Sequence, residues 1–299
     1  MNKKLNVDYS SAITELESIL NKYVPKRLYM KIFRGKGLEF DRYRKYEPDD
    51  DARLIDWKAS LRTNQILAKQ YIEERNLNIL FVVDVGENMV FGSSKKLKCE
   101  YSAEMTAAMM HLISSYNDNF GLILFSDKIK KYIGPDKGEN HFNFLTDMLS
   151  NSDYYGGNTN FEIVLDFLLD QVEDIDGIFF LSDFLHFSKK LKEKFDLVSE
   201  KFEVTSLMIQ DPLDISLPDK NMEIIIEDYR NHEQIVINPK RIKKEYEKLS
   251  SQKFEEVKLV FENSNADLFQ IKTDQDFALE LATFLNERAG KEQEMVLGS

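Results

Sequence analysis

Strand-length apolar runs that alternate with amphipathic helical stretches constrain this chain more than any other feature. Each run is nearly continuous in apolar residues, as in strands buried on both faces, and the runs are Leu77–Val83, Phe120–Phe125, Ile178–Leu181 and Val204–Ile209. Between them, apolar residues recur every three or four positions, which is typical of one helix face. The alternation predicts an α/β fold, with a mostly parallel central sheet and helices on both faces.

The pattern also predicts how the chain is divided. Residues 1–76 begin with a helical pattern and continue as short extended pieces, so we expect a small, partly β N-terminal subdomain or a layer packed on the main domain. Residues 77–289 carry the main α/β domain, in which a hairpin and a basic helix form an insertion over about 217–261. Residues 290–299 are expected to be a tail outside the fold.

Composition excludes several classes of protein. The single cysteine, Cys99, rules out an internal disulfide framework and a cysteine-based zinc site. The apolar runs are far too short to span a membrane, and the N-terminus lacks the pattern of a secretory signal, so we expect a cytoplasmic protein. The net charge of −12 argues against nucleic-acid binding, and no P-loop motif is present.

Charge is nevertheless unevenly distributed. Residues 1–77 hold 16 Lys and Arg against 12 Asp and Glu, and many of the basic residues lie in the segment Lys26–Lys45. A solvated face, or partners for the acidic remainder of the chain, is the plainer interpretation. A docking surface for an acidic protein or phosphate stays open, as does peripheral association with anionic lipid.

Polar side chains follow the predicted strands where each strand ends. Asp84 and Asn88 come after the first run, Asp183 comes after the third, and Thr159 precedes a helix. Because the carboxyl ends of parallel strands meet at one edge of a sheet, these groups are expected to converge there. Carboxylate, amide and hydroxyl oxygens suit a hard cation such as Mg²⁺ or Mn²⁺.

These positions resemble the metal-ion-dependent adhesion site of von Willebrand factor A domains, whose pattern is Asp-x-Ser-x-Ser followed by a distant Thr and Asp. The corresponding residues here are Asp84, Gly86, Asn88, Thr159 and Asp183. Gly86 offers no side chain, and Asn88 offers an amide in place of a hydroxyl. The resemblance implies a degenerate cation site held by Asp84, Asn88, Thr159 and Asp183. The alternative is that the two acids are bonded only to loop groups, without a metal.

A longer motif lies upstream, between Arg44 and Arg62. It is similar to the signature R-x-Y-x-P-G-D-D-x-R-x-I-D-W-x-x-S-A-R of the bacterial family called domain of unknown function fifty-eight, with Asp49 and Leu61 as departures. The matching residues that we expect to form a polar network are Arg44, Asp50, Asp51, Arg53, Asp56, Trp57, Ser60 and Arg62. Interleaved acids and arginines favour paired, hydrogen-bonded groups that fix a loop, with Trp57 as its apolar anchor.

The family resemblance implies a function without catalysis. It suggests a protein-interaction module that partners a MoxR-type AAA+ ATPase in assembly or remodelling of other proteins, and no catalytic residue is predicted. The alternative from another class is a metal-dependent hydrolase or nuclease that uses the acidic cluster Asp50, Asp51 and Asp56.

Overall fold

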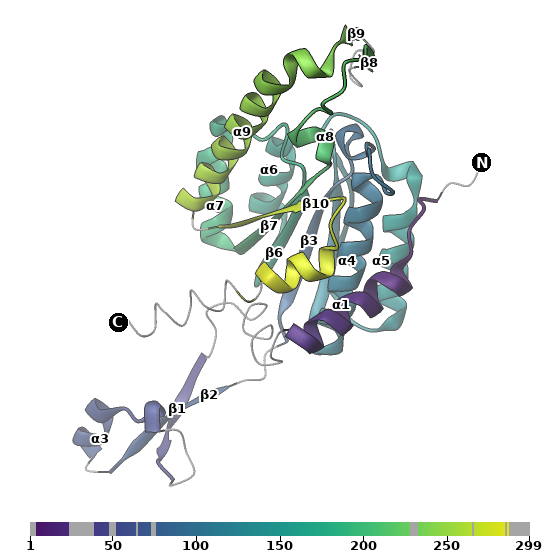
Figure 1. The fold of residues 1–299 in the computed structure, drawn as a ribbon. Coiled ribbons are helices and arrows are strands. Elements are labelled where there is room, and N and C mark those ends of the chain that lie inside the picture. Colours follow the sequence, from purple (N-terminus) through teal and green to yellow (C-terminus); the bar gives the residue numbers. More distant parts are fainter. Residues whose placement is uncertain are drawn as a thin grey trace. The chain divides into compact units, whose positions relative to one another are not determined.

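The computed structural model describes residues 4–23, 39–47, 52–63, 65–72, 76–227, 233–264, 266–284 and 286. The chain forms two compact units (Figure 1). The first, here called the body, comprises Met1–Phe33 and Leu77–Ser299. The second, the signature unit, comprises Arg34–Asn76. The expected subdomain over residues 1–76 is thus divided, because its first helix packs into the body.

A six-stranded sheet forms the centre of the body, with the strand order β10-β7-β6-β3-β4-β5. The strands are β3 (Asn78–Asp84), β4 (Asn119–Phe125), β5 (Ile129–Asp136), β6 (Gly177–Ser182), β7 (Glu203–Gln210) and β10 (Asp267–Lys272). Neighbouring strands pair in parallel, except that β5 runs antiparallel to β4. The predicted α/β fold class is confirmed, and all four apolar runs coincide with strands.

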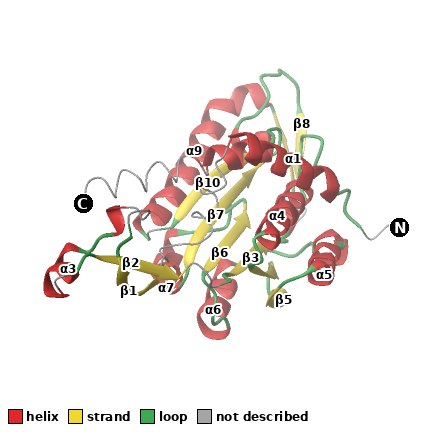
Figure 2. Cartoon of the chain, turned by 90° about the horizontal axis from the view of Figure 1, so that it is seen from below, coloured by secondary structure: helices red, strands yellow, loops and turns green. Residues whose placement is uncertain are grey.

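Helices cover both faces of this sheet (Figure 2). One face packs against α1 (Tyr9–Tyr23), α4 (Lys98–Ser115), α5 (Glu139–Ser150) and the helical residues 277–284. The other packs against α6 (Phe161–Gln171), α7 (Lys192–Lys201) and α9 (Pro239–Asn263). Strand β3 serves both cores, since Phe81 points into the first and Val82 into the second.

Helix α4 lies between the sheet and α1, so it is buried on almost every side. Leu16 and Leu20 of α1 belong to the same core cluster as α4. The segment before α1 is also fixed to this helix, because the backbone amide of Asn6 donates to Glu100 at 2.9 Å. An amphipathic helix that finds such a partner becomes part of the nearest core, which explains why α1 joins the body.

The predicted hairpin and helix over about 217–261 are present. Strands β8 (Ile224–Glu227) and β9 (Gln234–Ile237) pair antiparallel, and α9 begins at Pro239, directly after Asn238. Helix α9 was expected to be part of an insertion, but in the structure it belongs to the connection between two strands of the central sheet. It connects the parallel neighbours β7 and β10, and such neighbours need a crossover that returns the chain to the same end of the sheet.

The signature unit is a two-stranded antiparallel sheet with helical segments between the strands. Strand β1 (Glu39–Lys45) pairs with β2 (Leu67–Ile72), and the connection contains the short 3-10 helix η1 (Ala52–Leu54) and α3 (Trp57–Thr63). Within the described part of the chain, no helix combines the length and the apolar character needed to cross a bilayer.

Candidate functional site

The topology of the body places a crevice at the end of β3. From this central strand, the chain passes over one face of the sheet through α4 to reach β4, and it later returns over the other face through α6 to reach β6. Ligands of open parallel sheets bind outside the carboxyl ends of the strands at such a switch point. Asp84 is the last residue of β3, and Asp183 directly follows β6.

Asp84 is fully buried, and each of its carboxylate oxygens accepts two hydrogen bonds. Oδ1 accepts from the backbone amide of Gly86 at 2.8 Å and from the Thr159 hydroxyl at 2.7 Å. Oδ2 accepts from the Asn88 side-chain amide at 3.1 Å and from the Ser182 hydroxyl at 2.7 Å. Four donors from three separate chain segments therefore converge on one carboxylate.

Asp183 joins the same cluster through the Asn88 amide. Asn88 Nδ2 donates to Asp183 Oδ1 at 3.0 Å, and that oxygen also accepts from the backbone amide of Leu185 at 3.0 Å. Burial, followed by the charge of Asp183, raises the pKa of Asp84 to about 6. The structure thus brings together all four side chains predicted as cation ligands, and their contacts are with one another.

A buried ammonium group completes the cluster. Lys98, at the start of α4, is only 2% exposed. Its Nζ donates to Asp183 Oδ2 at 2.8 Å and to Asp214 Oδ2 at 2.9 Å, and it lies 5.6 Å from the ring centre of Phe91. Burial by itself would lower the pKa of Lys98, but the two carboxylates outweigh it, and the pKa is raised.

Sequence reasoning missed Lys98 and Asp214 as members of this cluster. A signal for Lys98 existed, because it lies three residues before Tyr101 and therefore falls on the apolar face of the predicted helix. A charged residue on an apolar face calls for a buried partner. Asp214 lies in the four-residue helix α8 (Pro212–Ile215), and no pattern in the sequence connects it to Lys98.

The space beside Gly86 is already filled. A Cβ atom on Gly86 would lie 2.1 Å from the Thr159 hydroxyl and 2.4 Å from Asn88 Oδ1. The adhesion-site pattern has a serine at this position. Its side chain could enter only if Thr159 or Asn88 moved, so the cluster has closed over the place of the missing ligand.

The residues as arranged do not fit a divalent cation. A cation needs oxygen lone pairs aimed into a common space, but both oxygens of Asp84 already accept two donors. Asn88 turns its nitrogen toward the two carboxylates, and the Lys98 ammonium occupies the outer oxygen of Asp183. Among the described residues, no group of three or more His, Cys, Asp or Glu side chains is arranged to hold a metal.

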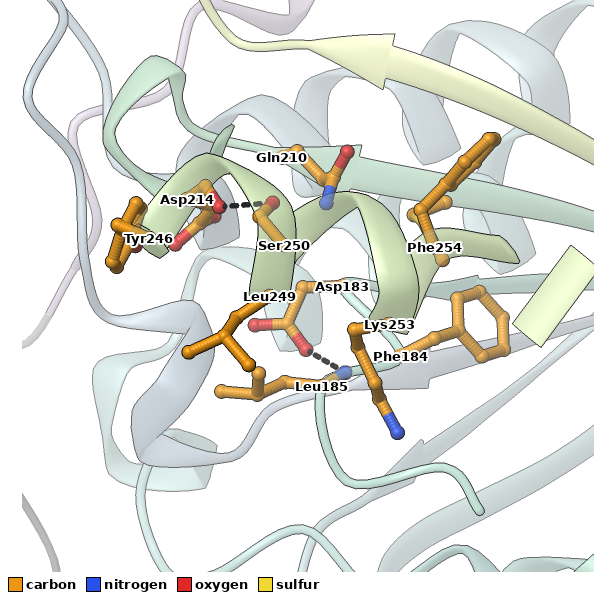
Figure 3. Close-up of a pocket in the computed structure, with 11 residues that line it drawn as sticks. Asp183, Phe184, Leu185, Gln210, Asp214, Tyr246, Leu249, Ser250, Lys253 and Phe254 are labelled. Atoms are coloured by element: carbon orange, nitrogen blue, oxygen red, sulfur yellow. Dashed lines mark hydrogen bonds between the residues drawn. The ribbon is translucent and has the colours of Figure 1, made fainter. Parts of the chain in front are cut away.

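A pocket of about 290 Å³ adjoins the cluster, between the segment after β6 and helix α9 (Figure 3). It is lined by Asp183, Phe184, Leu185, Met208, Gln210, Asp214, Tyr246, Leu249, Ser250, Lys253 and Phe254. Helix α9 is held in place here, since the Ser250 hydroxyl donates to the backbone carbonyl of Asp214 at 2.8 Å. Leu185 and Leu249 are both exposed at this pocket.

Two residues of the expected polar network, Asp56 and Ser60, form hydrogen bonds within the signature unit. Asp56 begins α3 by accepting from the backbone amide of Ala59 at 3.0 Å, and it also accepts from the Tyr43 hydroxyl at 3.0 Å. These hydrogen bonds, the first of them foremost, lower the pKa of Asp56. The Ser60 hydroxyl donates to the carbonyl of Asp56 at 2.6 Å and accepts from the amide of Leu67 at 2.8 Å, which fixes α3 to β2.

Other expectations for this unit have different outcomes. Trp57, expected together with Ile55 to supply an apolar anchor, is 64% exposed within this unit, and Ile55 is partly buried. Arg44 lies on β1, Arg53 lies in η1, and Arg62 lies in the last turn of α3. Asp50 and Asp51, together with most of the basic segment Lys26–Lys45, lie outside the described residues.

Fold and site together define an α/β domain with a closed carboxylate cluster at its strand ends, accompanied by a small unit that carries the Arg44–Arg62 motif. The chain belongs to the family described as "Protein of unknown function DUF58", whose profile matches residues 42–256.

Individual proteins similar to this chain are distant from it. "Uncharacterized protein Rv1480" of Mycobacterium tuberculosis and "Uncharacterized protein Mb1516" of Mycobacterium bovis are each 21% identical to it, over 87% of this chain and 82% of their own. Among solved structures, the hypothetical protein BatB from Bacteroides thetaiotaomicron has a TM-score of 0.46 and 11% identity, over 72% of this chain and 100% of its own. The PilB minor pilin from Streptococcus sanguinis has a TM-score of 0.40 and 10% identity, over 76% of this chain and 64% of its own.

Proposed function

We propose that this chain is a non-enzymatic protein-interaction module that docks a partner at the strand-end edge of the body. The observation that carries the proposal is that exposed apolar side chains adjoin the buried cluster: Leu185 and Leu249 line the pocket, and Phe91 lies next to Lys98. Exposed apolar residues gathered beside a pocket and surrounded by polar groups are typical of protein-binding surfaces.

The buried cluster gives this surface a rigid base. The backbone of Leu185 is held by Asp183, and Lys98, which bonds Asp183, lies over the ring of Phe91. Two of the three exposed apolar residues are therefore positioned directly by cluster members. A surface ordered before binding loses less conformational entropy when the partner docks.

The resemblance to von Willebrand factor A domains and the DUF58 signature support a MoxR-type AAA+ ATPase as the partner class. Two modes of recognition follow from the site. In one, a carboxylate of the partner completes the shell of a cation bound at the cluster; in the other, the partner docks directly on the apolar edge. The closed hydrogen bonding of Asp84 supports the second mode.

Binding of a purified MoxR-type ATPase from the same organism to the immobilised full chain tests the proposal. Leu249→Asp should weaken binding at least tenfold, because it places a charge at the pocket. Leu259→Asp is the matched control, since both leucines lie on α9 and are similarly exposed, at 60% and 51%, but only Leu249 lines the pocket. Direct docking also predicts equal affinity in Mg²⁺ and in EDTA.

The outcomes separate the parts of the proposal. Equal loss of binding in both leucine variants would refute the strand-end edge as the docking surface. Absence of binding by the unmodified chain would refute the ATPase as its partner. The rival hydrolase function has no such support, because the carboxylate of Asp56 is engaged in starting α3.

A further inference from the structure

We propose that the Lys98 ammonium and the Asn88 amide take the place of a divalent cation at the strand ends, so that this cluster is a complete site without metal. The inference concerns the body by itself and does not depend on which partner docks there. Three features of the cluster carry it: the donors around Asp84, the orientation of the Asn88 amide and the position of the Lys98 charge.

The first feature is the number of donors around Asp84. A carboxylate offers about four lone-pair directions, and Asp84 accepts four hydrogen bonds from buried or backbone groups. A cation that bound to either oxygen would have to displace at least one of these donors. A displaced donor would lose its partner in a region that water does not reach, since Asp84 and Ser182 are fully buried.

The second feature is the orientation of the Asn88 amide. Asn88 Nδ2 donates to both Asp84 and Asp183, while Asn88 Oδ1 points away from the carboxylates and lies 2.6 Å from the Thr159 hydroxyl. The reversed amide would aim its oxygen at two carboxylates and lose both hydrogen bonds. Asn88 therefore presents a donor to the carboxylates, where the hydroxyl of the adhesion-site pattern would present an oxygen ligand to a cation.

The third feature is the position of the positive charge. The Lys98 ammonium lies within hydrogen-bonding distance of Asp183 and Asp214, so it already neutralises the carboxylate that would otherwise attract a metal. A dication placed beside this buried ammonium would meet strong repulsion that solvent screens only weakly. The ammonium is covalently attached to α4, so it loses no translational entropy when it contacts the carboxylates. A free ion does lose translational entropy on binding.

Titration of the purified full chain with Mn²⁺, followed by electron paramagnetic resonance, tests this inference. The unmodified chain should show only weak binding without saturation, and Asp84→Asn should behave identically. Lys98→Ala should gain one saturable site with at least tenfold higher affinity, because Asp183 and Asp214 lose their cation. Lys95→Ala, an exposed lysine in the preceding loop, should gain nothing.

Two results would overturn the inference. One is saturable one-to-one Mn²⁺ binding by the unmodified chain that Asp84→Asn abolishes. The other is a folded Lys98→Ala variant, verified by circular dichroism, that gains no affinity for Mn²⁺. If this variant does not fold, the comparison of the unmodified chain with Asp84→Asn decides the matter. None of these readouts involves a partner protein, so they stand or fall separately from the proposed function.

Discussion

Replacing Lys98 with methionine should destabilise the body by about 3 kcal/mol. Methionine keeps most of the apolar stem but removes the ammonium, which leaves Asp183 buried without its cation. Removing one member of a buried ion pair costs about 3–5 kcal/mol. The lower end of this range is expected because the Asp214 side chain, the other partner, is 27% exposed and can be hydrated.

The two units of the chain allow this loss to be assigned to the body. The only tryptophan, Trp57, lies in the signature unit, so its fluorescence reports that unit. Far-ultraviolet circular dichroism is dominated by the long helices of the body. In urea, the dichroism transition of Lys98→Met should move to lower denaturant, whereas the Trp57 transition should stay close to its original position.

Two comparisons make the prediction refutable. Lys95→Met, in the exposed loop before α4, should change the free energy of unfolding by less than about 0.5 kcal/mol. Adding Asp183→Asn to Lys98→Met should cost less than the sum of the two single changes, with a coupling of about 1–3 kcal/mol, because the unpaired charge is removed. Strict additivity, or a Lys98→Met variant as stable as Lys95→Met, would show that the ion pair does not hold the cluster together.

Two further predictions concern the same cluster. The pKa of Asp84 is raised from 3.8 to about 6, so the folded state holds this proton more tightly than the unfolded chain does. The unmodified chain should therefore lose about 2 kcal/mol of stability relative to Asp84→Asn between pH 4 and pH 7, measured by urea unfolding, and parallel pH profiles would contradict this. Gly86→Ser should cost about 1–3 kcal/mol by overpacking. Gly134→Ser, where the nearest atom is 3.8 Å from the added Cβ, should be nearly neutral in the same urea unfolding assay.

The sequence was most informative where burial dictates the residue pattern. Strands such as β3 and β6 are enclosed on both faces, so their apolar runs are visible without any tertiary information. The convergence of Asp84 and Asp183 followed from the same reasoning, because parallel neighbours end at one edge. Once the parallel strands have been predicted, the residues that directly follow them can therefore be predicted to lie close together.

What the sequence did not reveal depends on side-chain conformation and on distant partners. The bond between Lys98 and Asp214 joins residues 116 positions apart, and neither helix pattern requires it. The sequence likewise left two placements open for α1, a separate subdomain or a layer on the main domain, because an amphipathic face shows that a helix has a partner but not which one. Trp57 is exposed within its unit although its neighbours Asp56 and Ser60 form hydrogen bonds, and the sequence pattern alone does not distinguish these two situations.

The position of the signature unit within the chain affects how the body can fold. The unit is inserted between α1 and β3, so the body must close a long loop before α1 can pack on α4. Pairing of Glu39 with Ile72 in the β1–β2 ladder brings the two ends of this insertion together. Once the hairpin has formed, the loop to be closed no longer includes the residues between Glu39 and Ile72, so less chain entropy is lost in closing it. Pairing of β1 with β2 therefore reduces the chain entropy that is lost when the N-terminal helix packs on the body.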